Sequence, residues 1–514
     1  MASQQERSFA TTLLPIWFLL PLVGVIIAAT LEPIPPHDYW WHLVMGREIA
    51  STGVVPSSNL FLYTLPQSLP FVDQPWLAQW ILYQVHGAAG YAGGVLLRNF
   101  LVVMSWGVAL HAMWKRAPNP MVVGATALVL ILLTVPVLTV RTRIFAFVPF
   151  AILLWSIFGA AEDPKRAKWL FLNVVSTAFW VNVHGTFILA PVLLSAATLS
   201  IIAERVLRTR EHSWRELGIW MSATAATVLS VALSPSGLGV YDYVLLLSVR
   251  SNVSSSVSEW RPPSIDEPIG QFFLVVLCIS VVLLALKRKN VRIFEALVFA
   301  AGVVLASSAV RSMFWFAMAS AVVLVPHIAT LVPRQTSEAR RLNTFILVVF
   351  LAVGLMVQPG LLHGFAVENS TLGLARRSGD GALYLGYENA TGAASAIKAR
   401  LPNERIFHDQ TLGGLLEWTL ADQGPRQVAF VDQRMEMITD DVWADYFQVL
   451  TGDEWRAVLN RWEVNVIIVR CDEQWPLVQR LSADSQWVGV YADEVHLVFV
   501  RRGEALTRWR STPT

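Results

Sequence analysis

Long apolar runs, each ended by charged or polar residues, fill the first 360 positions of the chain. The first run, residues 8–31, holds 24 residues without an ionisable side chain, whereas a helix needs about 20 to cross the hydrocarbon core of a membrane. Further runs recur at about residues 93–114, 120–140, 144–161, 169–181, 187–203, 217–241, 270–286, 293–310, 313–332 and 343–358. The pattern predicts a polytopic α-helical membrane protein with about 11 transmembrane helices.

Lysine and arginine predict the orientation of these spans. The first run is too long for a signal sequence and lacks a small-residue cleavage site, so we expect it to remain as a helix. Basic clusters fall in alternate loops, at Lys115–Arg116, Lys165–Lys168, Arg205–Arg210, Lys287–Lys289 and Arg340–Arg341. The positive-inside rule then predicts a cytoplasmic N-terminus and an extracytoplasmic location for everything after Gln358.

Composition and motif content support the membrane class and argue against several classes of function, among them nucleic-acid binding. Of the 514 residues, 54% are hydrophobic and only 15% charged, whereas a soluble protein carries about a quarter charged residues. Cys278 and Cys471 lie in different segments and predict no disulfide framework. We find no Gly-rich phosphate loop, no clustered zinc ligands and no DNA-reading motif, so we expect no nucleic-acid partner and assign no cofactor.

The chain falls into two predicted domains. Residues 1–360 form the transmembrane domain, in which residues 32–92 make a long first extracytoplasmic loop with amphipathic helices. Residues 361–514 are less apolar and predict an extracytoplasmic α/β domain, with buried strands at 405–409, 427–432, 464–470 and 495–502. Helical stretches at 440–450 and 453–462 lie between these strands, which favours a partly parallel sheet. Asp432 and Arg434 form either a buried ion pair or a site.

The first loop opens with "PPHDYWWHL", residues 35–43. Asp38 occupies an N-cap position for a helix that runs to Gly53, and this helix would place Asp38 and His42 one turn apart on one face. A second helix is predicted over residues 73–87, with Asp73 as its cap. Its apolar residues recur at helical spacing, so it is expected to lie along the membrane interface.

Three arginines at predicted outer membrane edges run against the positive-inside trend, namely Arg141, Arg143 and Arg311. A guanidinium near the bilayer centre costs about 2.5–3.5 kcal/mol, so an intramembrane arginine usually pairs or functions. Because a guanidinium binds phosphate through two parallel hydrogen bonds, we predict that at least one of the three binds phosphate. Extension toward lipid headgroups is the alternative, and it is the one we expect for Arg98.

Other candidate residues lie in three further segments. "WVNVHG" places Asn182 and His184 at a reversal between two short helices, where they would contact a sugar, orient the carboxylate or only make structural hydrogen bonds. With His37 and His42, His184 would bring three imidazoles together, which leaves a divalent-metal site as an alternative. Glu259 follows in a later outer loop, and the Trp41 ring offers a face for a sugar.

Several motifs resemble those of the GT-C superfamily of polytopic membrane glycosyltransferases, in particular the bacterial subgroup related to protein-mannosyltransferases and aminoarabinose transferases. The motifs are "HDYWWHLVMGREIASTGVVPSSNLFLYT", "DQPWLAQW", "WVNVHGTF", "LSPSGLGVYDY", "SEWRPP", "AVRSMFWF" and the later "GG" and "VDQR". The resemblance implies sugar transfer from a polyprenyl-phosphate carrier, with an acidic residue of the first outer loop as base or metal-side ligand. Asp38 matches that position, although Tyr39 follows it where mannosyltransferases have a second acid, and Asp73-Gln74-Pro75 departs from the commoner His-Glu version.

We therefore predict a glycosyltransferase of the bacterial inner membrane that moves a sugar from a polyprenyl-phosphate-linked lipid to a glycan, lipid or protein acceptor. Asp38 is the predicted catalytic base, unless it serves only as a cap, because a carboxylate bound to backbone amides is a poor base. The predicted substrate-binding residues are His37, His42, Trp41, Asp73, Arg141, Arg143, Asn182, His184, Glu259 and Arg311. The alternative is a catalytically inactive GT-C-derived binding or assembly subunit of a membrane complex. A transporter is disfavoured by spans with almost no acidic residues and no internal repeat.

Overall fold

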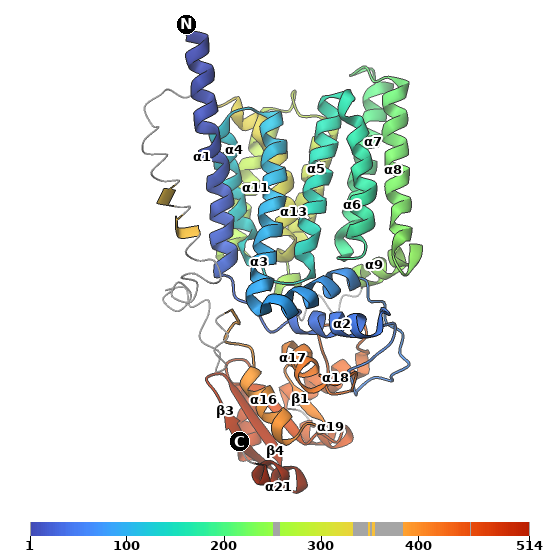
Figure 1. Cartoon of the computed structure of the whole chain (residues 1–514), viewed down its shortest axis with the longest axis vertical. Helices are drawn as coiled ribbons and strands as arrows, with labels where there is room; N and C mark the ends of the chain where they lie inside the picture. Colours follow the sequence, from blue (N-terminus) through green and yellow to red (C-terminus); the bar gives the residue numbers. More distant parts are fainter. Residues whose placement is uncertain are drawn as a thin grey trace. The chain divides into compact units, whose positions relative to one another are not determined.

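The computed structural model describes residues 2–249, 258–332, 348–349, 352–354, 384–452 and 454–512. The chain divides into two compact units (Figure 1). The first unit comprises Met1–Leu31, Leu96–Thr139 and Arg143–His363. The second comprises Glu32–Val95, Val140–Thr142 and Gly364–Thr514, so the first loop and the C-terminal segment belong to one unit.

Apolar helices make up the first unit and run side by side in Figure 1. Their bounds are α1 Ala2–Leu31, α4 Pro120–Ile131, α5 Phe147–Glu162, α6 Leu172–Trp180, α7 Leu189–Val206, α8 Trp214–Ser230, α9 Val240–Val249, α11 Pro268–Leu286, α12 Ile293–Ser308 and α13 Met313–Ala329. Among them, α1 packs against α4, α7 against α8, and α12 against α13. The predicted polytopic helical architecture is confirmed.

Among the described residues, fewer helices than predicted are long enough to cross a membrane. Within the described ranges, seven helices are long and apolar enough to cross a membrane, and Trp17–Leu31 and Ile293–Ser308 are shorter apolar helices. The predicted span at 169–181 is instead a 3-10 segment, η3 Pro164–Phe171, followed by the nine-residue α6. The predicted span at 343–358 lies mostly outside the described residues. A count of about 11 is therefore not confirmed.

Helix α3, Trp76–Arg116, joins two segments that the sequence predicted separately, a loop helix at 73–87 and a span at 93–114. Non-helical backbone angles at Ala89 and Gly90 separate its two parts. In the second part, Arg98 is fully buried and donates a hydrogen bond to the Leu138 carbonyl at 3.2 Å. The prediction that Arg98 reaches lipid headgroups is therefore wrong, because the residue faces the helix bundle and not its lipid side.

Four residues join the ends of α7, α8 and α12, and we call them the charged network: Glu204, His212 and Glu216, which are buried, and Arg292, whose side chain is 9% exposed. Arg292 donates from Nη2 and Nε to the two Glu204 oxygens at 2.7 and 3.1 Å. The His212 ring nitrogens lie 2.9 Å from Glu204 Oε2 and 3.0 Å from Glu216 Oε1. Such pairing is the condition under which ionisable groups are tolerated in a protein interior.

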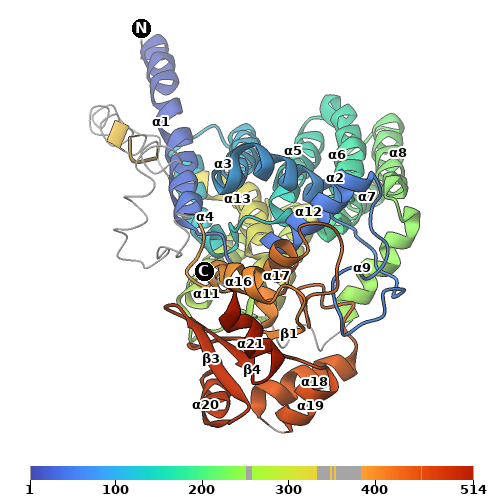
Figure 2. The same ribbon diagram turned by 60° about the horizontal axis from the view of Figure 1, so that its bottom comes forward.

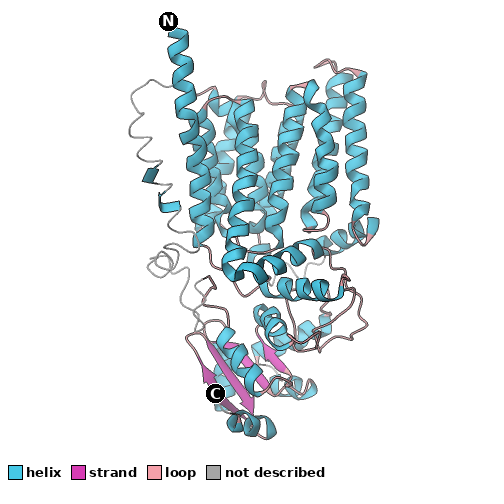
Figure 3. Cartoon of the chain, in the orientation of Figure 1, coloured by secondary structure: helices cyan, strands magenta, loops and turns pink. Residues whose placement is uncertain are grey.

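All described strands lie in the C-terminal segment and appear in magenta in Figure 3. They are β1 Ile406–His408, β2 Val466–Arg470, β3 Trp487–Ala492 and β4 His496–Arg501, in the spatial order β1-β2-β4-β3. The β1–β2 pair is parallel and the other two pairs are antiparallel. The helices are α16 Thr391–Arg400, α17 Gly413–Leu420, α18 Asp440–Thr451, α19 Trp455–Arg461, α20 Trp475–Ala483 and α21 Glu504–Ser511. The predicted partly parallel α/β domain is confirmed, with β3 as a strand that the sequence pattern missed.

The predicted strand at 427–432 is wrong. Ala429 makes an isolated parallel bridge with Leu62 of the first loop, and its carbonyl accepts a hydrogen bond from the Tyr63 amide at 3.1 Å. The apolar side chains that suggested a strand, such as Phe430 and Val431, are buried in a core shared with residues of the first loop. The segment therefore joins the first loop and not the sheet.

Candidate functional site

Helix α2, Tyr39–Thr52, carries the predicted site and is held by close packing within the second unit. A side chain at Gly46 would collide with the Gln79 carbonyl of α3, and a Cβ at Gly414 of α17 would lie 2.7 Å from the Trp41 amide nitrogen. The packing of α17 on α2 can be followed in Figure 2. Two glycines thus permit the backbone approach that fixes α2, and a rigid element is the usual support of a functional site.

Asp38 directly precedes α2 but does not cap it. Its side chain makes no cap hydrogen bond, and its backbone has φ 65° and ψ −48°. Oδ2 accepts a hydrogen bond from Arg141 Nη1 at 2.7 Å, and Oδ1 accepts one from the Trp41 indole at 3.3 Å. The cap prediction is therefore wrong, because the carboxylate turns away from the helix amides. A non-glycine residue at this positive φ is strained, and such strain gathers at functional sites.

The surroundings keep Asp38 ionised. Burial raises its pKa, but the charge of Arg141 lowers it, with weaker effects of the same sign from His42 and His37, so the pKa lies well below its ordinary value. The side chain nevertheless remains 23% exposed, whereas that of Arg141 is only 7% exposed. The site therefore offers a charged hydrogen-bond acceptor that is open to a ligand on one side.

A chain of polar side chains lies behind Asp38. His42 Nε2 lies 3.3 Å from the Thr142 hydroxyl, and its Nδ1 lies 3.4 Å from Gln79 Nε2. Gln79 Nε2 in turn donates to Asp73 Oδ1 at 2.8 Å. Burial, opposed by the charge of Asp38, lowers the pKa of His42 to about 3, so its imidazole is neutral at physiological pH.

Asp73 does not cap α3, which begins at Trp76, so this prediction is also wrong. The carboxyl group is buried, and Oδ2 has no hydrogen-bond partner within the described part of the chain. Burial raises the pKa of Asp73 to about 7, although the Gln79 hydrogen bond and the charge of Arg434 both act to lower it. A carboxyl group that titrates near neutrality is suited to exchange protons.

A second group of predicted residues lies in the first unit. Arg143 Nη1 donates to the Arg311 carbonyl at 3.2 Å, and its Nη2 lies 3.7 Å from Glu259 Oε2. The Arg311 guanidinium lies 3.1 Å from the centroid of the Trp260 ring. Arg143, Glu259 and Arg311 are thus brought together by segments that are far apart in the sequence.

Asn182 and His184 serve the local backbone. Asn182 donates to the Ala178 carbonyl at 2.8 Å, while His184 Nδ1 accepts from the Thr186 amide at 3.2 Å and caps η4, Gly185–Ile188. These contacts match the structural alternative that the sequence left open for both residues.

The residues around Asp38 do not form a metal-ligand set. Oδ2 of Asp38 faces a guanidinium, which would repel a cation from the same side. Among the described residues, no group of three or more His, Cys, Asp or Glu side chains could hold a metal ion.

Arg434 is the site neighbour whose role sequence reasoning left open. It is fully buried and donates from Nε to Asp432 at 2.6 Å and from Nη2 to Glu417 at 2.7 Å. The centre of its guanidinium lies 5.9 Å from the centroid of the Trp41 ring. Its Nη1 atom lies 3.6 Å from the sulfur of Met45. Both contacts are on α2, so a buried cation of the C-terminal segment supports the helix that carries the site. The "VDQR" motif held the signal, but nothing in it identified α2 as the partner.

Comparison with known proteins gives structural likenesses only. No protein-family model matches the chain, and no curated protein matches it. ArnT from Cupriavidus metallidurans, solved with undecaprenyl phosphate, is 15% identical over 98% of this chain and 99% of that chain, with a TM-score of 0.47. The Archaeoglobus fulgidus oligosaccharyltransferase, solved with zinc and sulfate, is 10% identical over 94% of this chain and 73% of that chain, with a TM-score of 0.49.

Proposed function

We propose that this chain is an integral membrane glycosyltransferase that transfers a sugar from a polyprenyl-phosphate donor to an acceptor outside the cytoplasm. In this proposal it lies in the bacterial inner membrane with its N-terminus in the cytoplasm. The observation that carries the proposal is the strained, ionised Asp38 at the end of the rigid helix α2, beside the guanidinium of Arg141. A carboxylate next to a cation is the pairing that sugar transfer from a phosphate requires.

The reaction divides between these two groups. The acceptor hydroxyl loses its proton to the Asp38 carboxylate while its oxygen forms a bond to the anomeric carbon. The bond between that carbon and the donor phosphate breaks, and the phosphate leaves with the electron pair. Arg141 stabilises the negative charge of the leaving phosphate, as a guanidinium does for phosphate in general.

The ion pair in the present structure makes Asp38 a weak base. When the donor phosphate accepts hydrogen bonds from Arg141, the carboxylate loses part of the charge that lowers its pKa. Asp38 then becomes more basic in the step in which it must take a proton. Donor binding and activation of the base would thus be coupled through one guanidinium.

The same ion pair is the observation that favours the alternative. A carboxylate held permanently by Arg141 would suit a GT-C-derived subunit that binds a lipid phosphate or assembles a complex without turnover. Fold alone does not distinguish the two functions.

An assay of polyprenyl phosphate release separates the two functions. The purified chain is incubated with polyprenyl-phosphate pentoses and hexoses, and a membrane extract supplies the acceptor. We expect Asp38→Asn to lower the rate by about 10²–10⁴-fold, the usual contribution of a general base. The matched control is Asp422→Asn, at an exposed carboxylate paired with Lys398, and it should turn over normally. Full turnover by folded Asp38→Asn would remove Asp38 as the base, and donor binding without turnover by the native chain would favour the inactive subunit.

A further inference from the structure

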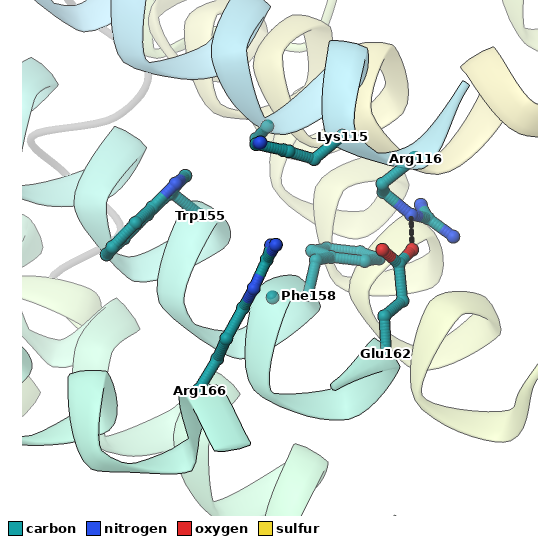
Figure 4. A pocket seen from close by; sticks show the side chains of 8 residues that line it. Lys115, Arg116, Trp155, Phe158, Glu162 and Arg166 are labelled. Atoms are coloured by element: carbon teal, nitrogen blue, oxygen red, sulfur yellow. Dashed lines mark hydrogen bonds and ion pairs between the residues drawn. The ribbon is translucent and has the colours of Figure 1, made fainter. Parts of the chain in front are cut away.

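A shallow pocket lies where two membrane-crossing helices end in the first unit, and nothing in the proposed transfer reaction uses it (Figure 4). Helix α3 ends at Arg116 and α5 ends at Glu162, both within the lining. The empty volume is about 210 Å³, including the part that opens to solvent. Because the apolar runs of both helices end here, the pocket lies at the depth of lipid headgroups.

One wall of the pocket is fixed by Arg116, which makes two ion pairs. Arg116 Nε donates to Glu162 at 2.6 Å, and the guanidinium also pairs with Glu295 and lies 4.4 Å from the centroid of the Phe158 ring. Two carboxylates therefore neutralise Arg116. Its place in the wall is structural, and the charge that faces the pocket comes from other residues.

Lys115 and Arg166 supply that charge. Figure 4 shows the ends of both side chains facing the space between Trp155 and Phe158. Lys115 is exposed and makes no ion pair within the described part of the chain, while Arg166 lies 3.4 Å from the exposed carboxylate of Asp163. The Trp155 indole adds a third N–H group to the lining. Among the described residues, the mouth therefore presents hydrogen-bond donors and the ammonium charge of Lys115, which no carboxylate pairs there.

Apolar surface adjoins the donors. The Trp155 and Trp169 rings lie 6.2 Å apart, and Trp169 and Phe171 are 44% and 42% exposed. Exposed aromatic side chains next to lysine and arginine are typical of the membrane interface. A soluble phosphate would use the donors only, whereas a phospholipid would use the donors and the apolar surface together.

We propose that this pocket binds the phosphate headgroup of an anionic glycerophospholipid, with Lys115 and Arg166 as the charged contacts and Trp155 as a neutral donor. Basic pockets between transmembrane helices bind anionic headgroups by this chemistry. The site is separate from the Asp38 site in sequence and in residues, so it stands whether or not the chain transfers sugars.

Native mass spectrometry of the purified full chain tests the proposal, with phosphatidylglycerol and phosphatidylcholine offered in equal amounts. We expect the native chain to retain phosphatidylglycerol preferentially. The double variant Lys115→Gln/Arg166→Gln should lose that preference by about 10- to 30-fold. Each basic residue near anionic lipid contributes about 1 kcal/mol, and about 1.4 kcal/mol corresponds to a tenfold change in affinity. Trp155→Phe should reduce the preference less.

Two controls make the outcome decisive. Arg288→Gln/Lys289→Gln removes the same charge from an exposed loop of the same unit and should leave the preference intact. Lys115→Arg/Arg166→Lys keeps both charges and should retain it. Three results would each overturn the proposal. The first is an equal loss of lipid preference in the two glutamine double variants, and the second is equal retention of the two lipids by the native chain. The third is displacement of phosphatidylglycerol by inorganic phosphate.

Discussion

Two buried polar clusters of this chain are built from similar residues but differ in how well their hydrogen bonds are satisfied. In the charged network, none of the buried side-chain nitrogen or oxygen atoms of its four residues lacks a partner among the described residues. Around Asp38, by contrast, Asp73 Oδ2 and Gln79 Oε1 both lack one within the described ranges, and the Asp38 backbone is strained.

This difference separates a structural cluster from a functional one. Native proteins satisfy nearly all buried polar groups, so each exception requires a reason. The charged network links helix ends and is complete in itself. The Asp38 cluster keeps acceptors and strain that lower its stability, which is expected where a substrate completes the hydrogen bonding. Substitutions should therefore act in opposite directions in the two clusters.

The largest effect is expected from Arg292→Met in the charged network. It removes both hydrogen bonds to Glu204 and a third from Nη1 to the Ala161 carbonyl, and leaves Glu204 buried. We expect the free energy of unfolding to fall by about 3–5 kcal/mol, as it does when other buried ion pairs lose one partner. The readout is the midpoint of thermal denaturation in detergent. Arg288→Met, at an exposed position of the preceding loop, is the control and should change the midpoint little; a similar midpoint for both would contradict the structural role of the network.

Asp73→Asn is expected to have a smaller effect of opposite sign, namely an increase in the stability of the folded chain. The folded pKa of about 7 exceeds the ordinary value of 3.8, so the unfolded chain loses this proton first and the native protein becomes less stable as pH rises from about 4 to 7. Asparagine cannot ionise and removes this loss. We expect the variant to gain about 1–4 kcal/mol relative to the native chain at pH 8 and much less at pH 4. Denaturation midpoints at the two pH values measure the difference, and a gain that is equal at both would show that ionisation of Asp73 is not its cause.

The smallest effect concerns the backbone at Asp38. Asp38→Gly and Asp38→Ala both remove the carboxylate and its contact with Arg141, but only glycine adopts φ 65° without strain. We expect the glycine variant to be about 1 kcal/mol more stable than the alanine variant. Both should lack transferase activity. Equal denaturation midpoints would mean that the backbone at residue 38 relaxes once the carboxylate is gone.

Local patterns in the sequence predicted the elements and many of the candidate residues. The alternation of apolar and polar positions indicated the helical bundle and three of the four strands, and "PPHDYWWHL" identified Asp38 and His42 as neighbours. The arginines at the outer edges indicated partners, and Arg141 does contact Asp38. Each of these inferences depended on spacing within one segment or on the cost of a charge near lipid.

The mistaken predictions depended on contacts between distant segments. The N-cap alternative for Asp38 could not be ruled out locally, because its partner Arg141 lies 103 positions away. Residues 427–432 have the composition of a strand, but their backbone bonds to the first loop and not to the sheet. The raised pKa of Asp73 arises from burial, which no local pattern reveals.

The two glycine contacts of α2 bear on how this protein could be altered or recombined. Trp41 lies against a residue without a side chain on α17, more than 370 positions further along the chain. A C-terminal domain borrowed from another protein would fit only if it also presented a bare backbone at that point. Chimeras joined between the bundle and the sheet should therefore fold only when the first loop is exchanged together with the C-terminal segment.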